Sequence, residues 1–280
     1  MKLLRLTVDG FAVPCILDRE GGARDVSSLV QDFTAETLPD VAATLSGVDL
    51  SALPAVPVID ADILPPMARP GTIWCVGLNY SDHAEEAGLP VPSEPILFNK
   101  AIGTYCGPNA PLLHSEKMSK LDWEVELGIV IGKRALNVSR DAAMDHVFGY
   151  TVVNDVSERA WQMERGGQWV KGKSFPNFCP TGPWLVTRDE VADPQALSMW
   201  LDVNGERMQA GTTARMIFDV ATIVSYMSEF CVLEPGDVIC TGTPPGVGMG
   251  KKPPRYLKPG DVVELGIDGL GRQRQTVEAI

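Results

Sequence analysis

Two glutamates two residues apart begin the most informative segment of the chain, DWEVELGIVIG. If this segment is a β-strand, Glu124 and Glu126 lie side by side on one face, because side chains alternate across a strand. The apolar residues between and after them then face the opposite way, into a core: Val125, Leu127, Ile129 and Ile131. Two carboxylates on one face of a mostly apolar strand are unfavourable without a counter-ion. We therefore expect a cation beside this pair.

A third carboxylate, Asp155, ends a second strand-like run, GYTVVND. Three oxygen ligands without a convincing His or Cys partner favour Mg²⁺, Mn²⁺ or Ca²⁺ over Zn²⁺. A plainer interpretation stays open, because an ExE pair is common. In it, the two glutamates form the solvated face of an edge strand, and Asp155 caps a helix over residues 157–165.

A possible acid–base pair stands in the segment GLNYSDHAEE, where His83 and Glu86 are three residues apart. In a helical turn such residues are neighbours, so the carboxylate can orient the imidazole as a general base that activates water. Glu85 lies two positions from His83 and points away. An ordinary charged surface helix explains this spacing equally well.

Two loops could bind an anionic substrate. WVKGKSFPNFCPTGPW offers Lys171 and Lys173 to neutralise a carboxylate or a developing enolate, although loop lysines are usually solvated. CTGTPPGVGMG offers the hydroxyls of Thr241 and Thr243 with free backbone N–H groups. It lacks the Lys-Ser/Thr ending and the following helix of a phosphate-binding P-loop.

The net charge of −12 over 280 residues argues against a nucleic-acid partner, which needs clustered Lys and Arg. An acidic substrate would need a metal or local cations to reverse the sign of the field in the site. No apolar run approaches the roughly 20 residues that span a bilayer, and the start lacks a signal-peptide core. The six cysteines show no CxxC pair, so we expect reduced thiols and a cytoplasmic protein.

The elements that must position these residues fall into two parts. Residues 1–18 predict a hairpin that turns at Asp9-Gly10, followed by weakly helical segments over 26–33 and 41–45. Prolines recur from residue 51 to 71 and indicate a boundary. We expect a small N-terminal domain over residues 1–68 and a larger catalytic domain over 69–280.

The larger part is mainly strands with few helices. Strands are expected over 72–76, 123–131, 149–154, 238–240 and 262–267, with a hairpin turn at Asn204-Gly205. Helices are expected over 81–87, 139–146 and 216–230. The absence of regular βαβ alternation predicts a β-rich α+β or barrel-like fold.

Taken in order, five motifs resemble the fumarylacetoacetate hydrolase family: GLNYSDHAEE, DWEVELGIVIGK, GYTVVNDVSER, WVKGKSF and TGTPPGVG. The resemblance implies a mixed β-roll catalytic domain that binds Mg²⁺ or Mn²⁺ and forms a homodimer. By motif position it implies three metal ligands (Glu124, Glu126 and Asp155), a water-activating pair (His83 with Glu86), a substrate cation (Lys173) and substrate contacts (Arg159, Gln162 and Thr243). One departure is Pro176, where relatives often carry an acid.

The family resemblance leaves several activities open. The expected one is hydrolysis of the C3–C4 bond of a 2,4-diketo acid to pyruvate and a carboxylate, with a 2,4-diketo-3-deoxy sugar acid as the favoured substrate. Alternatives are an oxaloacetate decarboxylase and a 2-hydroxyhepta-2,4-diene-1,7-dioate isomerase or decarboxylase. A Ca²⁺-binding assembly module without catalysis is the non-enzymatic alternative.

Overall fold

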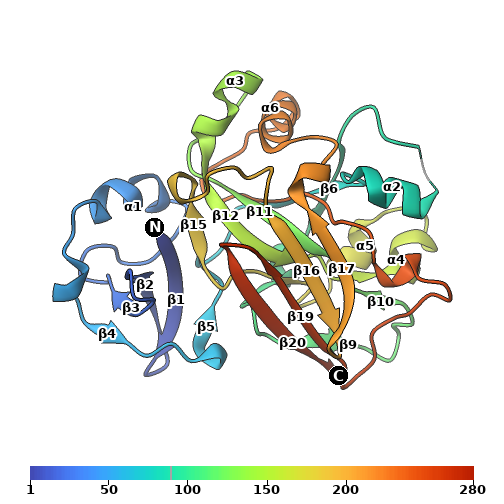
Figure 1. The fold of residues 1–280 in the computed structure, drawn as a ribbon, viewed down its shortest axis with the longest axis horizontal. Coiled ribbons are helices and arrows are strands. Elements are labelled where there is room, and N and C mark those ends of the chain that lie inside the picture. The colour runs from blue at the N-terminus through green and yellow to red at the C-terminus, as the bar shows by residue number, and fades with distance from the viewer. Residues whose placement is uncertain (89) are drawn as a thin grey trace.

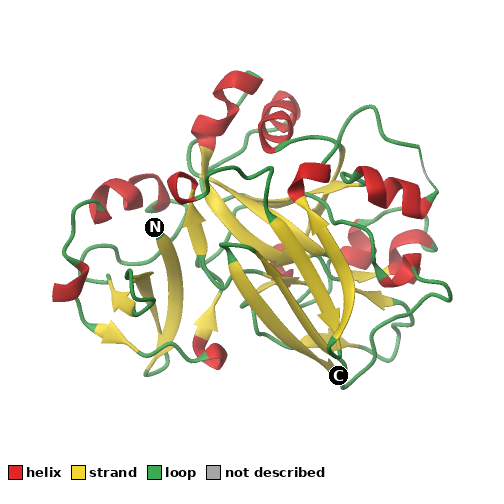
Figure 2. Cartoon of the chain, viewed as in Figure 1, coloured by secondary structure: helices red, strands yellow, loops and turns green. Residues whose placement is uncertain are grey.

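The computed structural model describes residues 1–88 and 90–280. Strands fill the centre of the molecule and short helices lie at its periphery (Figure 2). The N-terminal part, blue in Figure 1, lies beside a larger part built from two packed sheets. This strand-rich arrangement confirms the predicted β-rich α+β fold.

The N-terminal part begins with the predicted hairpin of β1 (Lys2–Val8) and β2 (Phe11–Leu17). Its turn residues Asp9 and Gly10 have φ values of 51° and 83°, as a primed hairpin turn requires. Short strands β3 (Ala23–Asp25), β4 (Ala55–Val56) and β5 (Ile63–Leu64) and one helix, α1 (Leu38–Leu45), complete it.

The helix expected over residues 26–33 is wrong, because this segment forms turns. Val26, Val30 and Phe33 are buried at a helix-like spacing. However, the backbone N–H of Val26 donates to the carbonyl of Pro14 in β2, which ties the segment to the sheet. The second expected helix exists as α1 and begins earlier, at Leu38.

The larger sheet joins the two parts of the chain. Its strand order is β4-β3-β2-β1-β15-β12-β11-β18-β6-β7, with β5 paired to β1. Because β1 pairs with β15, one sheet crosses from residues 1–68 into the rest, and the proposed domain boundary stays a prediction. The strands not yet given bounds are β6 (Ile73–Gly77), β7 (Ile96–Lys100), β11 (Val125–Ile131), β12 (Val147–Asn154), β15 (Leu185–Thr187) and β18 (Val238–Cys240).

The second sheet has the order β17-β16-β19-β20-β9 and lies across the larger one (Figure 1). The expected Asn204-Gly205 turn links its first two strands. Leu127 of the larger sheet and Leu201 and Leu265 of the second are fully buried in one core. The bounds are β9 (Leu112–His114), β16 (Ser198–Val203), β17 (Glu206–Thr212), β19 (Val262–Ile267) and β20 (Gly271–Ala279).

Short elements occupy the edges of the two sheets. Two small pairs join β10 (Leu121–Asp122) to β13 (Ser157–Glu158) and β8 (Tyr105–Cys106) to β14 (Cys179–Pro180). The remaining α-helices are α2 (Ser81–Ala87), α3 (Arg140–Ala143), α4 (Arg159–Met163), α5 (Val170–Lys173) and α6 (Val220–Phe230). Single 3₁₀ turns are Leu50–Ala52, Asp60–Asp62, Ile102–Thr104, Met144–His146, Arg188–Glu190, Thr213–Arg215 and Gly248–Gly250.

Helix α6 begins four residues later than expected. The Asp219 side chain accepts from the backbone N–H of Thr222 and caps the helix there. Residues before the cap are held elsewhere, since the backbone N–H groups of Ile217 and Phe218 donate to Asn79. In the described part of the chain, no helix is long and apolar enough to cross a membrane.

Strand β11 has two different faces. Val125, Leu127, Ile129 and Ile131 point into the core between the sheets, as expected from the sequence. On the other face, Val130 packs with the buried residues of the N-terminal part, among them Leu3 and Leu38. The carboxylates at the start of the strand share this second face.

Close packing of β12 on β15 gives a test of the sheet that joins the two parts. A Cβ on Gly149 would lie 2.1 Å from the Val186 carbonyl oxygen, so we expect Gly149→Ala to destabilise the protein by about 1–3 kcal/mol or more. Gly103→Ala is the control, because its Cβ would meet nothing within 4 Å. Equal midpoints of urea unfolding for the two variants would contradict this packing.

Candidate active site

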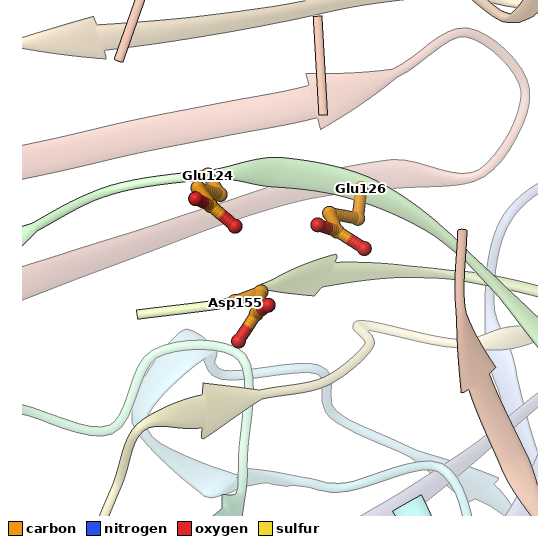
Figure 3. A group of neighbouring side chains, drawn as sticks. All are labelled: Glu124, Glu126 and Asp155. Carbon is orange, nitrogen blue, oxygen red and sulfur yellow. The ribbon is translucent and has the colours of Figure 1, made fainter. Parts of the chain in front are cut away.

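The three carboxylates singled out in the sequence converge (Figure 3). Glu124 precedes β11, Glu126 lies in it, and Asp155 directly follows β12. Pairing of β11 with β12 aligns them, and the Asp155 N–H donates to the Glu124 carbonyl at 2.9 Å. One carboxylate oxygen from each lies within 4.8 Å of the others. The side chains are buried, with residue exposures of 6%, 2% and 0%.

The plainer interpretation of these acids does not hold. β11 is flanked by β12 and β18, so it is an interior strand and not an edge strand. Asp155 caps no helix, because Glu158 caps α4 by accepting from the Ala160 N–H. The acids are therefore packed inside the protein, where unpaired charge is unfavourable.

Three buried cations compensate two of the acids. Lys173 Nζ lies 2.8 Å from Glu124 Oε2 and 2.7 Å from Asp155 Oδ2. Arg159 Nη2 lies 2.6 Å from Glu124 Oε1. Lys100 donates to Asp155 Oδ1 and, at 3.1 Å, to the Val156 carbonyl. These ion pairs hold the carboxylate oxygens in fixed orientations.

A glycine makes the position of Lys173 possible. α5 packs against α4 so closely that a Cβ on Gly172 would lie 2.5 Å from the Glu158 carbonyl oxygen and 2.6 Å from the Gln162 nitrogen. The short helix can therefore bring Lys173 to the acids only with glycine beside it. Lys171, on the other side of this glycine, is exposed and donates to the Arg165 carbonyl.

Glu126 differs from its neighbours, because it makes no ion pair with any residue in the described ranges. Its Oε2 accepts from the Gly242 N–H at 2.8 Å. Burial, followed by the negative charges of Asp155 and Glu124, raises the pKa of Glu126 well above its ordinary value. Burial alone would also raise the pKa of Glu124, but Lys173 and Arg159 outweigh it and hold that pKa below its ordinary value.

The donor set fits a hard divalent cation. Three carboxylate oxygens converge, and one acid lacks a positive partner that such an ion would supply. Mg²⁺ and Mn²⁺ both take oxygen ligands of this kind. Glu124, Glu126 and Asp155 are the residues that could hold the ion.

The candidate acid–base pair is also formed. On α2, His83 Nδ1 lies 3.1 Å from Glu86 Oε2, whereas Glu85 is exposed, as expected. Glu86 also accepts from the Gly246 N–H, at 2.9 Å and 3.1 Å to its two oxygens. With Nδ1–H donated to Glu86, the imidazole presents its basic Nε2.

One pocket collects most of the predicted residues. The polar side chains that line it are His83, Glu124, Glu126, Arg159, Gln162, Lys173 and Thr243. Glu86 and Asp155 contact these residues from behind without lining the pocket. Pro176 is exposed and does not line it.

The three residues predicted to contact substrate, Arg159, Gln162 and Thr243, already form hydrogen bonds within the protein. Arg159 Nη1 donates to Gln162 Oε1 at 3.0 Å, which directs the Gln162 amide. Thr243 Oγ1 donates to the Val125 carbonyl and accepts from Gln209, so its single proton is already used. Their roles toward a substrate remain predictions.

Two residues of the site escaped the sequence analysis. Asp122 is buried and binds Arg159 Nε at 2.8 Å and the backbone N–H groups of Gly248 and Met249. It lies two residues before Glu124, so continuing the same alternation backward would have found it. Lys100 is buried at the end of β7, where no local pattern marks it.

Comparison with known proteins now defines the class of this molecule. The family model described as fumarylacetoacetate (FAA) hydrolase, C-terminal, matches residues 72–278. The chain belongs to the fumarylacetoacetate hydrolase family. A protein of Burkholderia multivorans, named provisionally as a hydrolase, is 53% identical over 284 residues, 100% of this chain and 99% of its own length.

Solved structures of the family show the same fold. Fumarylacetoacetate hydrolase from Exiguobacterium antarcticum is 38% identical, with a TM-score of 0.89 and 100% of both chains covered. A 2-hydroxyhepta-2,4-diene-1,7-dioate isomerase from Mycobacterium marinum is 32% identical, with a TM-score of 0.79 over 100% of this chain and 98% of its own. Maleylpyruvate hydrolase from Sphingobium sp. SYK-6, solved with manganese (II) ion and pyruvate, is 27% identical, with a TM-score of 0.83 over 100% and 99%.

The charge imbalance at Glu126 gives a prediction for the metal-free protein. Between the ordinary pKa of a glutamate and the raised pKa of Glu126, the folded protein keeps a proton that the unfolded chain has lost. The free energy of unfolding therefore falls as the pH rises through this range. We expect Glu126→Gln to remove that fall, to be at least as stable as the wild type near pH 8, and to bind Mn²⁺ at least about 100-fold more weakly. Denaturant unfolding with a chelator and calorimetric Mn²⁺ titration measure both effects.

Glu124→Gln is the matched control two residues away. It should destabilise the metal-free protein, because it leaves Lys173 and Arg159 without their shared carboxylate. Equal destabilisation by both variants would contradict the assignment of Glu126 as the uncompensated acid.

Proposed function

We propose that this protein is a divalent-metal hydrolase that cleaves the C3–C4 bond of an acylpyruvate-type 2,4-diketo acid, releasing pyruvate and a carboxylate. The observation that carries the proposal is the placement of the His83–Glu86 pair on the same pocket as the carboxylate cluster. A cation site alone would serve decarboxylation or isomerisation equally. A positioned base for water favours hydrolysis.

A bound Mg²⁺ or Mn²⁺ would hold the 1-carboxylate and 2-oxo group of the substrate and polarise them. Its positive charge would offset the net negative charge of the protein at the point where the anionic substrate binds. Glu124, Glu126 and Asp155 would be its ligands. The chain itself contributes the base, the cation and the walls of the pocket.

In this mechanism His83 Nε2 accepts a proton from water while Glu86 holds the other ring nitrogen and stabilises the imidazolium. The hydroxide attacks the 4-carbonyl carbon and forms a tetrahedral intermediate. Collapse breaks the C3–C4 bond, leaves a carboxylic acid and places the electron pair on C3 as the pyruvate enolate. The Lys173 ammonium stabilises that negative charge, and the proton on His83 is available to C3.

Similar proteins support the class without naming the substrate. The maleylpyruvate hydrolase was solved with manganese (II) ion and pyruvate, and the Mycobacterium marinum neighbour is named as an isomerase of a dioate. Oxaloacetate decarboxylation and dienoate isomerisation therefore remain the enzymatic alternatives. A homodimer and a 2,4-diketo-3-deoxy sugar acid as substrate stay expectations of the family resemblance, and a cytoplasmic location stays an expectation of the cysteine pattern.

The proposal predicts metal-dependent cleavage that depends on His83. A panel of 2,4-diketo acids followed by their ultraviolet absorbance should be hydrolysed with Mg²⁺ or Mn²⁺ and not with a chelator. His83→Ala should lower kcat by about 10²–10⁴-fold, because it removes the base. His146→Ala is the matched control, since that imidazole lies outside the pocket and contacts the Lys133 carbonyl.

The same variants separate the alternatives. If His83→Ala loses diketone cleavage but retains oxaloacetate decarboxylation, the two activities use different groups of the site. If His83→Ala changes neither activity, the proposed role of His83 is wrong. A protein that binds Ca²⁺ and turns over no 2-oxo acid with any divalent ion would be the non-catalytic module.

A further inference from the structure

The pocket of the carboxylates also has an apolar wall. Six hydrophobic residues from five segments line the pocket: Val76, Leu78, Phe98, Met163, Trp169 and Met249. Val76 lies near the end of β6, and Phe98 lies in the neighbouring strand β7, where it pairs with Cys75. A substrate held at the acids would extend its far end along this wall.

Two aromatic rings form the centre of the wall. The rings of Phe98 and Trp169 meet edge to face, with centroids 5.3 Å apart and planes at 68°. Trp169 also lies directly on β6, because a Cβ on Gly77 would be 2.5 Å from its Cζ3 atom. The Trp169 ring is therefore packed against two neighbouring strands and presents a rigid apolar surface.

Two methionines form the rim of this wall and are exposed. Met163 is 53% exposed and Met249 is 38% exposed. Met163 ends α4 directly after Gln162, and the backbone N–H of Met249 is fixed by Asp122 at 3.0 Å. An apolar group between them would bury both, and the flexible thioethers could adapt to its shape.

The positively charged groups of the pocket are already engaged. Among the described residues that line it, the lysine and arginine side chains are Lys173 and Arg159, and both bind buried carboxylates. The Thr243 hydroxyl already donates a hydrogen bond to the Val125 carbonyl. A second carboxylate, or a row of hydroxyls, at the far end of a substrate would therefore lose water without gaining matched partners.

We propose that the acyl group beyond C4 is uncharged and apolar, an alkyl chain or an aromatic ring that packs on Phe98 and Trp169 under Met163 and Met249. This assignment rests on the proposed function, in which a divalent ion held by Glu124, Glu126 and Asp155 would bind the 1-carboxylate and 2-oxo group of the substrate. It favours apolar acylpyruvates over both the sugar-acid tail and the anionic tail of a dioate.

A substrate series that differs only in the tail tests the assignment. We expect kcat/KM with Mn²⁺ to rise about three- to fourfold for each methylene from a methyl to a propyl tail. A propyl tail that bears two hydroxyls should fall about 10–100-fold below plain propyl, and a tail that ends in a carboxylate should fall further. Equal rates for all tails, or a preference for the hydroxylated or anionic tail, would overturn the assignment.

Variants of the wall give a second test. Trp169→Ala should lower kcat/KM for the propyl tail at least about tenfold and for the methyl tail much less, whereas Phe230→Ala, an exposed aromatic at the end of α6, should change neither. Met163→Lys should raise the rate for the anionic tail relative to propyl, because it adds the missing cation at an exposed position. If Met163→Lys leaves this ratio unchanged, the anionic tail does not approach the rim.

Binding without turnover keeps this assignment separate from the proposed function. Calorimetry with Mn²⁺ and unreactive 2-oxo acids, from pyruvate to 2-oxohexanoate, should show Kd falling about three- to fourfold per methylene, and the gain should disappear in Trp169→Ala. If no diketo acid is hydrolysed but this trend holds, the hydrolase proposal fails and the apolar wall stands. If hydrolysis occurs but Kd does not depend on chain length, the apolar wall fails alone.

Discussion

Buried negative charge is the constraint on which the rest of the structure depends. Adjacent interior strands bring Glu124, Glu126 and Asp155 together, where water cannot solvate them, and the fold supplies cations to stabilise two of these acids. The short helices α4 and α5 that follow β12 return Arg159 and Lys173 to the cluster. The charge is left incompletely balanced at Glu126, so the framework favours a divalent ion there.

The glycine-rich loop after β18 contacts both the acid that orients His83 and the acid that orients Arg159. Glu86 holds its Gly246 N–H while orienting His83, and Asp122 holds the Gly248 and Met249 N–H groups while orienting Arg159. Each carboxylate thus fixes a functional side chain and the backbone of the opposite wall. Together with Glu126, which accepts from the Gly242 N–H, these two acids bind backbone donors of the loop.

Local patterns predicted what depends on local geometry. Strand alternation placed Glu124 and Glu126 on one face, and helical spacing placed His83 beside Glu86. Lys100 and Trp169 reach the site through tertiary contacts, so they leave no periodic signal in the sequence. The register that sets Asp155 beside Glu124 depends on how β11 pairs with β12, and neither strand shows this pairing by itself. The same limit explains the errors: residues 26–33 have helical spacing, but the Val26 N–H is bound by β2. The residues before α6 are bound by Asn79.

The second face of β11 has a consequence for how the protein can be divided. The strand carries its carboxylates at one end and Val130 at the other, and Val130 is covered by the core of the N-terminal part together with Leu185 and Val238. Without residues 1–68, three strands of the larger sheet would expose a continuous apolar surface and an unpaired edge at β15. The N-terminal part therefore covers this apolar face of the larger sheet and pairs with its edge at β15.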